Sequence, residues 1–109
     1  MCATIAAIAT GQAPGGIGVI RISGPQALEI AQRVFRSRSG RALGEIPGYQ
    51  ALLGQVFERD GRALDDCVAL VFRAPKSYTG EDVVELSCHG GLYVTRRVLE
   101  EVLAAGAVP

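Results

Sequence analysis

The sequence predicts one α+β domain, and three observations lead to that prediction. The chain has 109 residues, of which 49% are hydrophobic and 20% are charged, so it is long enough for one buried core and too short for two. Short β-branched runs bounded by turn-forming residues indicate strands. Two longer segments carry apolar residues at three- and four-residue spacing, which indicates amphipathic helices. We therefore expect a mixed β-sheet packed against two helices.

The first part of the chain predicts two strands and a helix. Residues 4–9 and 17–22 are β-branched runs separated by a glycine-rich loop. A helix should follow, with Ser23 as its cap, Pro25 in its first turn and Gln26 bonding back to the cap. The apolar residues at helical spacing are Ala27, Leu28, Ile30, Ala31, Val34 and Phe35.

The remaining part predicts a hairpin, a fifth strand and a second helix. Residues 51–57 and 67–72 are apolar runs, and the Asp-Gly pair between them is typical of turns that join antiparallel strands. Residues 82–88 form the next strand, and a helix follows with one apolar side. Residues 107–109 resemble the beginning of a further strand, so we interpret the chain as a fragment. The apolar side of the second helix consists of Val94, Val98, Leu99, Val102 and Leu103.

Charge and cysteine content argue against several functional classes. Lys and Arg together number 11, as do Asp and Glu, so the formal net charge is zero and the general signature of a nucleic-acid binder is missing. Cys2, Cys67 and Cys88 are an odd number without C-x-x-C spacing, which is typical of a reduced cytoplasmic protein. His89 adjoins Cys88, but neighbouring strand residues point to opposite faces, so we expect no metal site. No apolar stretch reaches the roughly 18 residues of a membrane span, and we expect no membrane partner.

Two charged residues interrupt otherwise apolar strands and are the candidate site residues. Arg21 shares a face with Ile17 and Val19, in a strand that is apolar on both faces and is therefore expected to be covered on both. Glu85 shares a face with Val83. A charged group on such a face needs a partner. Two interpretations stay open: the two residues pair with each other or lie at solvated strand ends, or they form a ligand site.

Three other segments could carry chemistry. Residues 11–18 contain neither a nucleotide P-loop nor a complete G-x-G-x-x-G, so we expect no GTP or NAD binding by this chain. His89-Gly90-Gly91 either presents free amides to an anion or only forms a tight turn. Residues 76–82 contain a tyrosine that either stacks on a planar ring or covers the sheet edge.

Four arginines lie within nine residues, with no acid between them, at and beyond the end of the first helix. They can contact RNA. The simpler interpretation is that they are solvated, because cations near a helix carboxyl end are favoured by the helix dipole. The four residues are Arg33, Arg36, Arg38 and Arg41.

Several strings of residues resemble one known family. In order they are TIAAIAT from Thr4, GGIGVIRISG from Gly15, PKSYTGEDVVEL from Pro75 and CHGG from Cys88. With the same order and spacing, they are similar to the amino-terminal domain of the MnmE family, also called TrmE, the tRNA modification GTPases. The string from the serine of PKSYTG to CHGG is long enough to be highly specific, whereas residues 37–67 match only in outline.

This resemblance implies a single folate-binding and dimerisation domain over residues 1–109, similar in fold to the folate-binding domains of aminomethyltransferases. It implies 5-formyltetrahydrofolate, or a related tetrahydrofolate, as the ligand near a homodimer interface. Its folate contacts fall on Arg21 and Glu85, with no catalytic residue and no metal ligand. A carboxylate such as Glu85 can accept two N–H groups of a pterin edge, while Arg21 can hold a carbonyl or carboxylate of the folate.

Members of the family also carry a helical domain, a GTP-binding domain and a C-terminal cysteine motif, all absent here. The resemblance therefore assigns GTP, Mg and K to the absent GTP-binding domain, and the chain alone is not expected to hydrolyse GTP. With the flavoprotein MnmG, such cytoplasmic proteins install an aminomethyl-type group at carbon 5 of the wobble uridine in tRNA.

Two departures from the family pattern bear on the folate site. The usual P-P-G-[RK]-G loop reads GQAPG at residues 11–15 and lacks the basic residue, and a further lysine contact of the family lies beyond Pro109. Two alternatives stay open. One is a folate-dependent aminomethyltransferase domain, and the other is a dimerisation or regulatory module in which Arg21 and Glu85 pair without a ligand.

Overall fold

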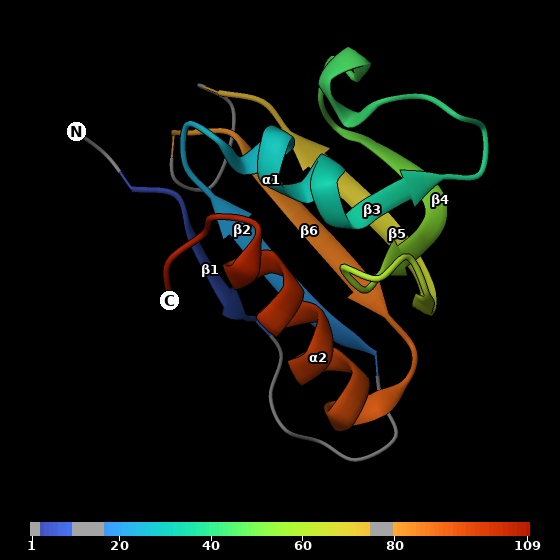
Figure 1. The fold of residues 1–109 in the computed structure, drawn as a ribbon. Coiled ribbons are helices and arrows are strands. Elements are labelled where there is room, and N and C mark those ends of the chain that lie inside the picture. Colours follow the sequence, from blue (N-terminus) through green and yellow to red (C-terminus); the bar gives the residue numbers. More distant parts are fainter. Residues whose placement is uncertain (1–2, 10–16, 75–79) are drawn as a thin grey trace.

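The computed structural model describes residues 3–9, 17–74 and 80–109. In these residues, six antiparallel strands form one sheet in the order β1-β2-β6-β5-β4-β3. Helices α1 and α2 both cover the same face of this sheet (Figure 1). The predicted α+β class is therefore confirmed. The elements are β1 (Ile5–Ile8), β2 (Gly18–Ser23), α1 (Ala27–Val34), β3 (Phe35–Ser37), the 3₁₀ helix η1 (Leu43–Glu45), β4 (Gln50–Phe57), β5 (Ala63–Phe72), β6 (Val83–Cys88) and α2 (Gly91–Ala104).

The one parallel pairing among the described residues is a bridge between Ile5 and Val108 at the outer edge of β1. The Ala6 N–H donates to the Val108 carbonyl at 2.9 Å, and the Val108 N–H donates to the Thr4 carbonyl at 2.9 Å. These bonds satisfy backbone groups that an edge strand otherwise leaves to solvent. The extended segment predicted at residues 107–109 therefore lies beside the sheet.

The core lies between the sheet and the two helices. Alternate residues of each strand point toward the helices, and the apolar positions spaced by three and four in α1 and α2 point back toward the sheet. Each fully buried aliphatic side chain contributes about 1.5–3 kcal/mol by leaving water. Neither helix in the described part of the chain is long and apolar enough to cross a membrane. The large side chains that are completely buried include Ile20, Ile22, Ile30, Val71, Val84, Leu86 and Val98.

Edge strand β3 is not predicted by the sequence. The apolar spacing assigns Phe35 to the first helix, but α1 ends at Val34 and Phe35 has extended backbone angles, φ −121° and ψ 139°. Phe35 pairs with Val56 of β4 and its ring is fully buried. The Phe35 ring can be buried whether its backbone is helical or extended. The backbone is extended here because Phe35 pairs with β4, and the spacing of apolar residues cannot reveal a pairing with a distant strand.

The start of α1 also differs from the prediction. Ser23 does not cap the helix, because it is the last residue of β2 and its backbone is paired in the sheet. The helix begins at Ala27, and the N–H of Gln26 donates to the hydroxyl oxygen of Thr4 at 2.9 Å. Thr4 precedes β1, so a residue distant in sequence satisfies the backbone donor at the entry to the helix.

Asp65 fixes the junction between β6 and α2. Its Oδ2 accepts the backbone N–H of His89 at 2.6 Å and that of Gly90 at 2.8 Å. A carboxylate is favoured at this position because the amino-terminal end of a helix carries partial positive charge. The two amides that the sequence leaves open for an external anion are therefore occupied by a carboxylate of the protein itself.

The two described cysteines are packing groups. Cys67 and Cys88 face each other across β5 and β6 with their Sγ atoms 4.0 Å apart, and both are buried and free. The hydrogen bond with Cys88, together with burial, raises the pKa of the Cys67 thiol, so it stays neutral and unreactive. His89 is exposed, as expected for a neighbour that points away from Cys88.

Gly54→Ala should lower the free energy of unfolding by about 1–3 kcal/mol, the usual cost of forcing extra atoms into tight packing. A Cβ at this position collides with the carbonyl oxygen of Arg36 and lies 2.8 Å from the Phe35 ring, so β3 must move away from β4. At Gly44 a Cβ meets nothing within 4 Å, and Gly44→Ala should change the stability by less than about 0.5 kcal/mol. Denaturant titration followed by circular dichroism compares the two variants. Equal losses contradict the close contact between β3 and β4.

Asp65→Ala should destabilise the protein by about 1–2 kcal/mol, because two backbone donors at the start of α2 lose their charged acceptor. The neighbouring residue Asp66 provides the control: it is exposed and contacts the Gln55 amide at 3.3 Å. Asp66→Ala should stay within about 0.5 kcal/mol of the wild type. Hydrogen exchange at the first turn of α2 should accelerate only in Asp65→Ala, and unchanged protection there argues against this role.

Candidate ligand site on the helix-free face

The sheet face opposite the helices carries the candidate site residues. We call it the helix-free face; its side chains include Ile5, Ala7, Ile17, Val19, Arg21, Ala51, Leu53, Val68, Leu70, Glu85 and Ser87. Both helices lie on the other side of the sheet (Figure 1), so neither of them covers this face of β2. Ile17 remains 57% exposed. Exposure varies across the face: Leu53 is 47% exposed, whereas Val83, which shares the face with Glu85, is fully buried.

Arg21 and Glu85 face each other at the centre of this face, as paired residues of β2 and β6. The Arg21 Nη2 lies 2.7 Å from Glu85 Oε2, and the Arg21 Nε donates to the same oxygen at 2.8 Å. The Arg21 side chain is 43% exposed and that of Glu85 is 14% exposed. The interpretation that the two residues pair with each other is confirmed. A partly exposed cross-strand pair of this kind contributes about 0.2–1 kcal/mol.

The geometry of the pair leaves hydrogen-bonding capacity on the carboxylate. Both guanidinium contacts go to Oε2, and Oε1 forms no hydrogen bond with any described residue. An ionised carboxylate offers about four acceptor positions on its two oxygens. Glu85 can therefore accept N–H groups from a ligand while it still contacts Arg21.

The surroundings of the pair are small or apolar. Ala7 stands beside Arg21 on β1, Leu70 stands beside Glu85 on β5, and Ala51 follows on β4. These three aliphatic side chains form an apolar floor around the pair, since side chains on one face of a sheet lie about 5 Å apart. The combination of an apolar floor, a carboxylate and a guanidinium suits a ligand with an apolar body, N–H donors at one edge and an anionic group elsewhere.

Some of the expected site segments lie outside the described residues. These are the loop at residues 11–15, with its departure from the family pattern, and residues 76–79, with the tyrosine. The segment that follows is held by Asp82, whose Oδ1 accepts the Ala74 N–H at 2.8 Å and lies 3.8 Å from the Arg73 Nε. Asp82 therefore ties the end of β5 to the start of β6 close to the candidate site.

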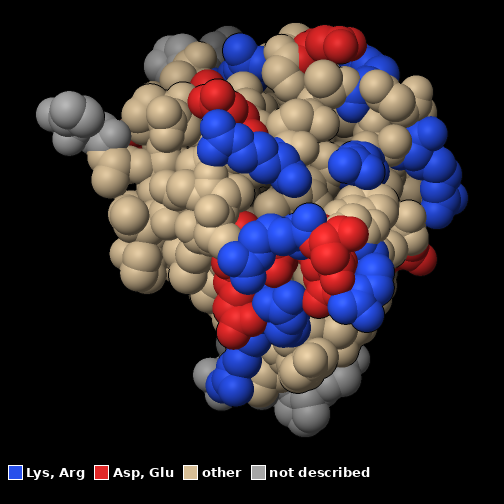
Figure 2. All heavy atoms as spheres, in the orientation of Figure 1, with Lys and Arg blue, Asp and Glu red and all other residues tan. Residues whose placement is uncertain are grey.

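A second polar cluster, which the sequence does not predict, lies on the helix side between α2 and the β4–β5 turn. Arg97 Nη2 contacts Glu58 at 2.9 Å and Glu101 at 3.0 Å, and Arg97 also pairs with Glu100. These contacts raise the pKa of Arg97. Positive and negative side chains interleave over this region in Figure 2. The four-residue spacing of Arg97 and Glu101 indicates an ion pair along a helix. The contact of Arg97 with Glu58 cannot be predicted in this way, because the fold brings Glu58 to it from the β4–β5 turn.

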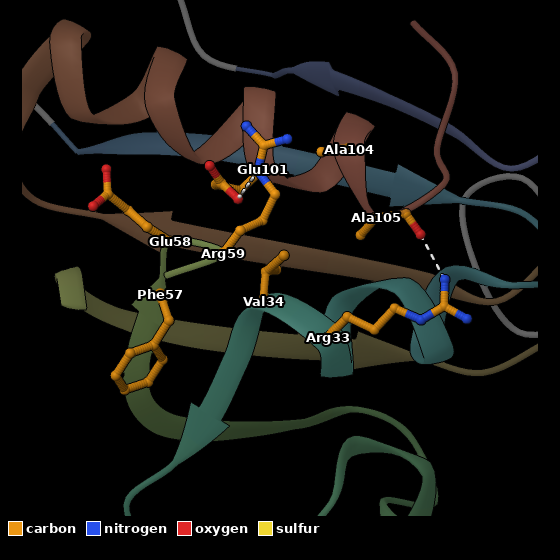
Figure 3. Close-up of a pocket in the computed structure, with 8 residues that line it drawn as sticks. All are labelled: Arg33, Val34, Phe57, Glu58, Arg59, Glu101, Ala104 and Ala105. Atoms are coloured by element: carbon orange, nitrogen blue, oxygen red, sulfur yellow. Dashed lines mark hydrogen bonds and ion pairs between the residues drawn. The ribbon is translucent and has the colours of Figure 1, made fainter. Parts of the chain in front are cut away.

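Glu101 is the buried member of this cluster, with 3% of its side chain exposed. Arg59 neutralises it from the β4–β5 turn, with Nε 3.2 Å from Oε1. Both side chains line a hollow of about 210 Å³, and Arg33, which also lines it, reaches the Ala105 carbonyl at 2.6 Å (Figure 3). Because its charges are paired within the protein, the cluster's evident role is to fasten the turn and both helix ends together.

The comparisons with known proteins agree with the resemblance seen in the sequence. Residues 4–109 match the family described as GTP-binding protein TrmE N-terminus. Proteins named tRNA modification GTPase MnmE are 57% identical in Symbiobacterium thermophilum, 52% in Thermus thermophilus and 50% in Geobacter sulfurreducens, over 104, 106 and 105 residues. These alignments cover 95%, 96% and 95% of the chain.

The same alignments cover 23%, 24% and 22% of those three proteins, so the chain spans less than a quarter of the length of these relatives. The match nevertheless extends over both strands that carry the candidate residues and over nearly all of this chain. The chain therefore belongs to the TrmE family, the MnmE tRNA modification GTPases, and corresponds to its amino-terminal part.

Proposed function

We propose that this chain is the folate-binding and homodimerisation domain of a tRNA modification GTPase. The observation that carries the proposal is the Arg21–Glu85 pair, which stands on a mainly apolar sheet face at the two positions where the family resemblance puts its folate contacts. In the whole protein, the domain serves the installation of an aminomethyl-type group at carbon 5 of the wobble uridine in tRNA, together with the flavoprotein MnmG. GTP, Mg and K act in another domain, so the chain alone does not hydrolyse GTP.

The proposed ligand is 5-formyltetrahydrofolate or a related tetrahydrofolate, which carries a one-carbon unit. Glu85 accepts N–H groups from the aminopyrimidine edge of the pterin, because its carboxylate has acceptor capacity beyond its contact with Arg21. Hydrogen bonds to an ionised carboxylate are stronger than those between neutral groups. Arg21, the more exposed member of the pair, turns toward a carbonyl or carboxylate of the folate. The apolar floor packs against the ring.

A second candidate function is a dimerisation or regulatory module without a ligand. The observation that favours it is that Arg21 and Glu85 already neutralise each other at 2.7 Å, so neither charge requires a ligand. A folate-dependent aminomethyltransferase domain is a weaker alternative, because the family match covers residues 4–109 and belongs to TrmE. The following measurement separates binding from pure assembly.

Calorimetric titration with 5-formyltetrahydrofolate should show saturable binding, and Glu85→Ala should weaken it by about 1.5–3 kcal/mol, the range for hydrogen bonds to a charged group. Glu45, exposed on η1, provides a control with the same change of net charge, and Glu45→Ala should bind as the wild type does. An unchanged isotherm for Glu85→Ala removes that residue from the site, and no binding by the wild type leaves the assembly module as the better proposal.

Arg21→Ala tests whether the arginine contacts the ligand or only competes with it. If Arg21 holds an anionic group of the folate, the variant should bind about 10- to 150-fold more weakly, since a lost charge-assisted bond costs about 1.5–3 kcal/mol. If Arg21 only pairs with Glu85 and does not contact the ligand, the same variant should bind the ligand more tightly, because both oxygens of the Glu85 carboxylate can then accept its N–H groups. Tighter binding therefore refutes the proposed contact of Arg21 while keeping that of Glu85.

The proposed dimer uses the helix-free face. A chain with no net charge has little long-range repulsion between copies, and a two-fold pairing buries one self-complementary surface twice. Leu53, 47% exposed on this face, should tolerate no charge at such an interface. Leu53→Glu should weaken the dimer at least about tenfold in sedimentation equilibrium, whereas Leu92→Glu, at a residue 41% exposed on α2, should not. A wild type that is monomeric at high micromolar concentration contradicts the proposal.

Folate and assembly should be coupled if both use this face. Saturating 5-formyltetrahydrofolate should then raise the dimer affinity, and dimerisation should raise the folate affinity by the same factor, because linkage between two binding equilibria is reciprocal. Sedimentation equilibrium with and without the ligand measures the factor. A dimer constant that does not change under saturating ligand shows that the two sites are independent.

A further inference from the structure

Three exposed arginines gather at one edge of the sheet, where no described carboxylate pairs with them. We call them the β3-edge arginines: Arg36, Arg38 and Arg41. Six other arginines form ion pairs with acids, namely Arg21, Arg33, Arg59, Arg62, Arg73 and Arg97. The β3-edge arginines form none with any described residue. The tenth arginine, Arg96 on α2, also forms no ion pair with a described residue. Three of these four arginines therefore lie along β3 and the loop after it, although the net charge of the chain is zero.

The backbone that carries these arginines is ordered by its own contacts. Phe35 points into the core, so Arg36 projects to the opposite side of β3. The Arg38 N–H donates to the Leu53 carbonyl at 2.8 Å and continues the pairing with β4. A turn at Gly40, with φ +81°, then brings the chain back, and the Ser37 hydroxyl donates to the Arg41 carbonyl at 2.7 Å. The three guanidinium groups are thus mounted on a short, well-defined piece of backbone.

A hollow of about 280 Å³ lies beside two of the three arginines. The guanidinium carbon of Arg36 lies 4.9 Å from the centre of the Phe57 ring, and this cation–π contact holds the group while its N–H edge stays available. A planar guanidinium presents paired donors that match the oxygens of a phosphate group. The lining residues are Arg36, Ser37, Arg38, Gly54, Gln55 and Phe57.

We propose that the β3-edge arginines bind the sugar–phosphate backbone of RNA. Several separate cations along one edge fit a chain of regularly spaced phosphates better than one small anion. Figure 2 shows arginine side chains, in blue, at the margin of the molecule where β3 and the following loop lie. That this RNA is tRNA rests on the proposed function. Phosphate contacts position a nucleic acid without reading its sequence, so this surface orients the substrate.

The test measures fluorescence anisotropy of a labelled, unmodified tRNA transcript titrated with the 109-residue chain at several salt concentrations. The triple variant Arg36→Gln/Arg38→Gln/Arg41→Gln should bind roughly tenfold or more weakly, and its plot of log affinity against log salt should be shallower by about 2–3, roughly one per lost phosphate contact. The corresponding triple change to Lys should keep most of the affinity, because it keeps the charge.

The matched control is Arg33→Gln/Arg62→Gln/Arg96→Gln, which changes the net charge equally at three other exposed arginines. It should retain affinity and salt dependence close to those of the wild type. Equal losses in both triple variants show diffuse attraction and overturn the assignment, as does wild-type binding by the β3-edge variant. Equal affinity for polyglutamate of matched charge assigns the surface to acidic peptides and overturns the RNA proposal.

Folate titration and thermal unfolding of the same proteins separate the two proposals. The β3-edge variant should keep the unfolding midpoint and the folate affinity of the wild type, because its substituted residues lie away from Arg21 and Glu85. A wild type that binds folate but not tRNA refutes the RNA surface and leaves the proposed function standing. A wild type that binds tRNA through these arginines but does not bind folate supports the surface and contradicts the folate assignment.

Discussion

The antiparallel pairing of β2 with β6 is the constraint on which the rest of the structure depends. It joins the first hairpin of the chain to the last strand and places Arg21 opposite Glu85, although 64 positions separate them in sequence. Burial of Ile20 and Leu86, a facing pair on the helix side, determines the register, because a slip of one residue exposes the apolar set and buries the charges. The core therefore positions the candidate site, and the ion pair between Arg21 and Glu85 adds little to the stability of this pairing.

This pairing also makes the fold dependent on contacts between distant parts of the chain. The central strands cannot pair until most of the chain has been made, and such non-local contacts require the closure of long loops before they stabilise anything. Asp65 contributes at the same place, since it belongs to β5 and holds the amides that follow β6. Strand β6 is thereby fixed by its neighbours on both sides and at its exit into α2.

The parts of the fold that follow from local patterns could be predicted from the sequence, and those that depend on distant partners could not. Apolar spacing predicts the main strands and both helices, and a charge on an apolar strand face is enough to single out Arg21 and Glu85. The spacing is misleading at Phe35, because a buried ring satisfies a helical face and an edge strand equally well. The contact of Thr4 with the start of α1 and the contacts of Glu101 could not be predicted either, because each of these partners belongs to another element of the fold.

The distribution of charge separates the surfaces that stabilise the fold from those that remain open to partners. On the helix side, Glu101 is buried but neutralised by Arg59 and Arg97, and removing one partner of a buried pair costs far more than the pair contributes. The charged residues of this region therefore stabilise the packing of the helices against the β4–β5 turn. The helix-free face carries exposed apolar groups instead, which gain free energy when an apolar partner covers them. The β3-edge arginines, which pair with no described carboxylate, gain free energy when an anion binds them.

The Arg21–Glu85 pair explains why the strand pattern alone could not choose between a salt bridge and a ligand site. Both interpretations need the same two residues on the same face, and the pair lets the protein hold its charges neutral when no ligand is bound. A ligand then exchanges one set of charge-assisted hydrogen bonds for another rather than meeting a bare buried charge, so the net gain per contact is modest. For the ligand and the dimer that we propose, the affinity is therefore expected to come largely from the apolar floor and from a second surface around the pair, such as a facing copy of the chain.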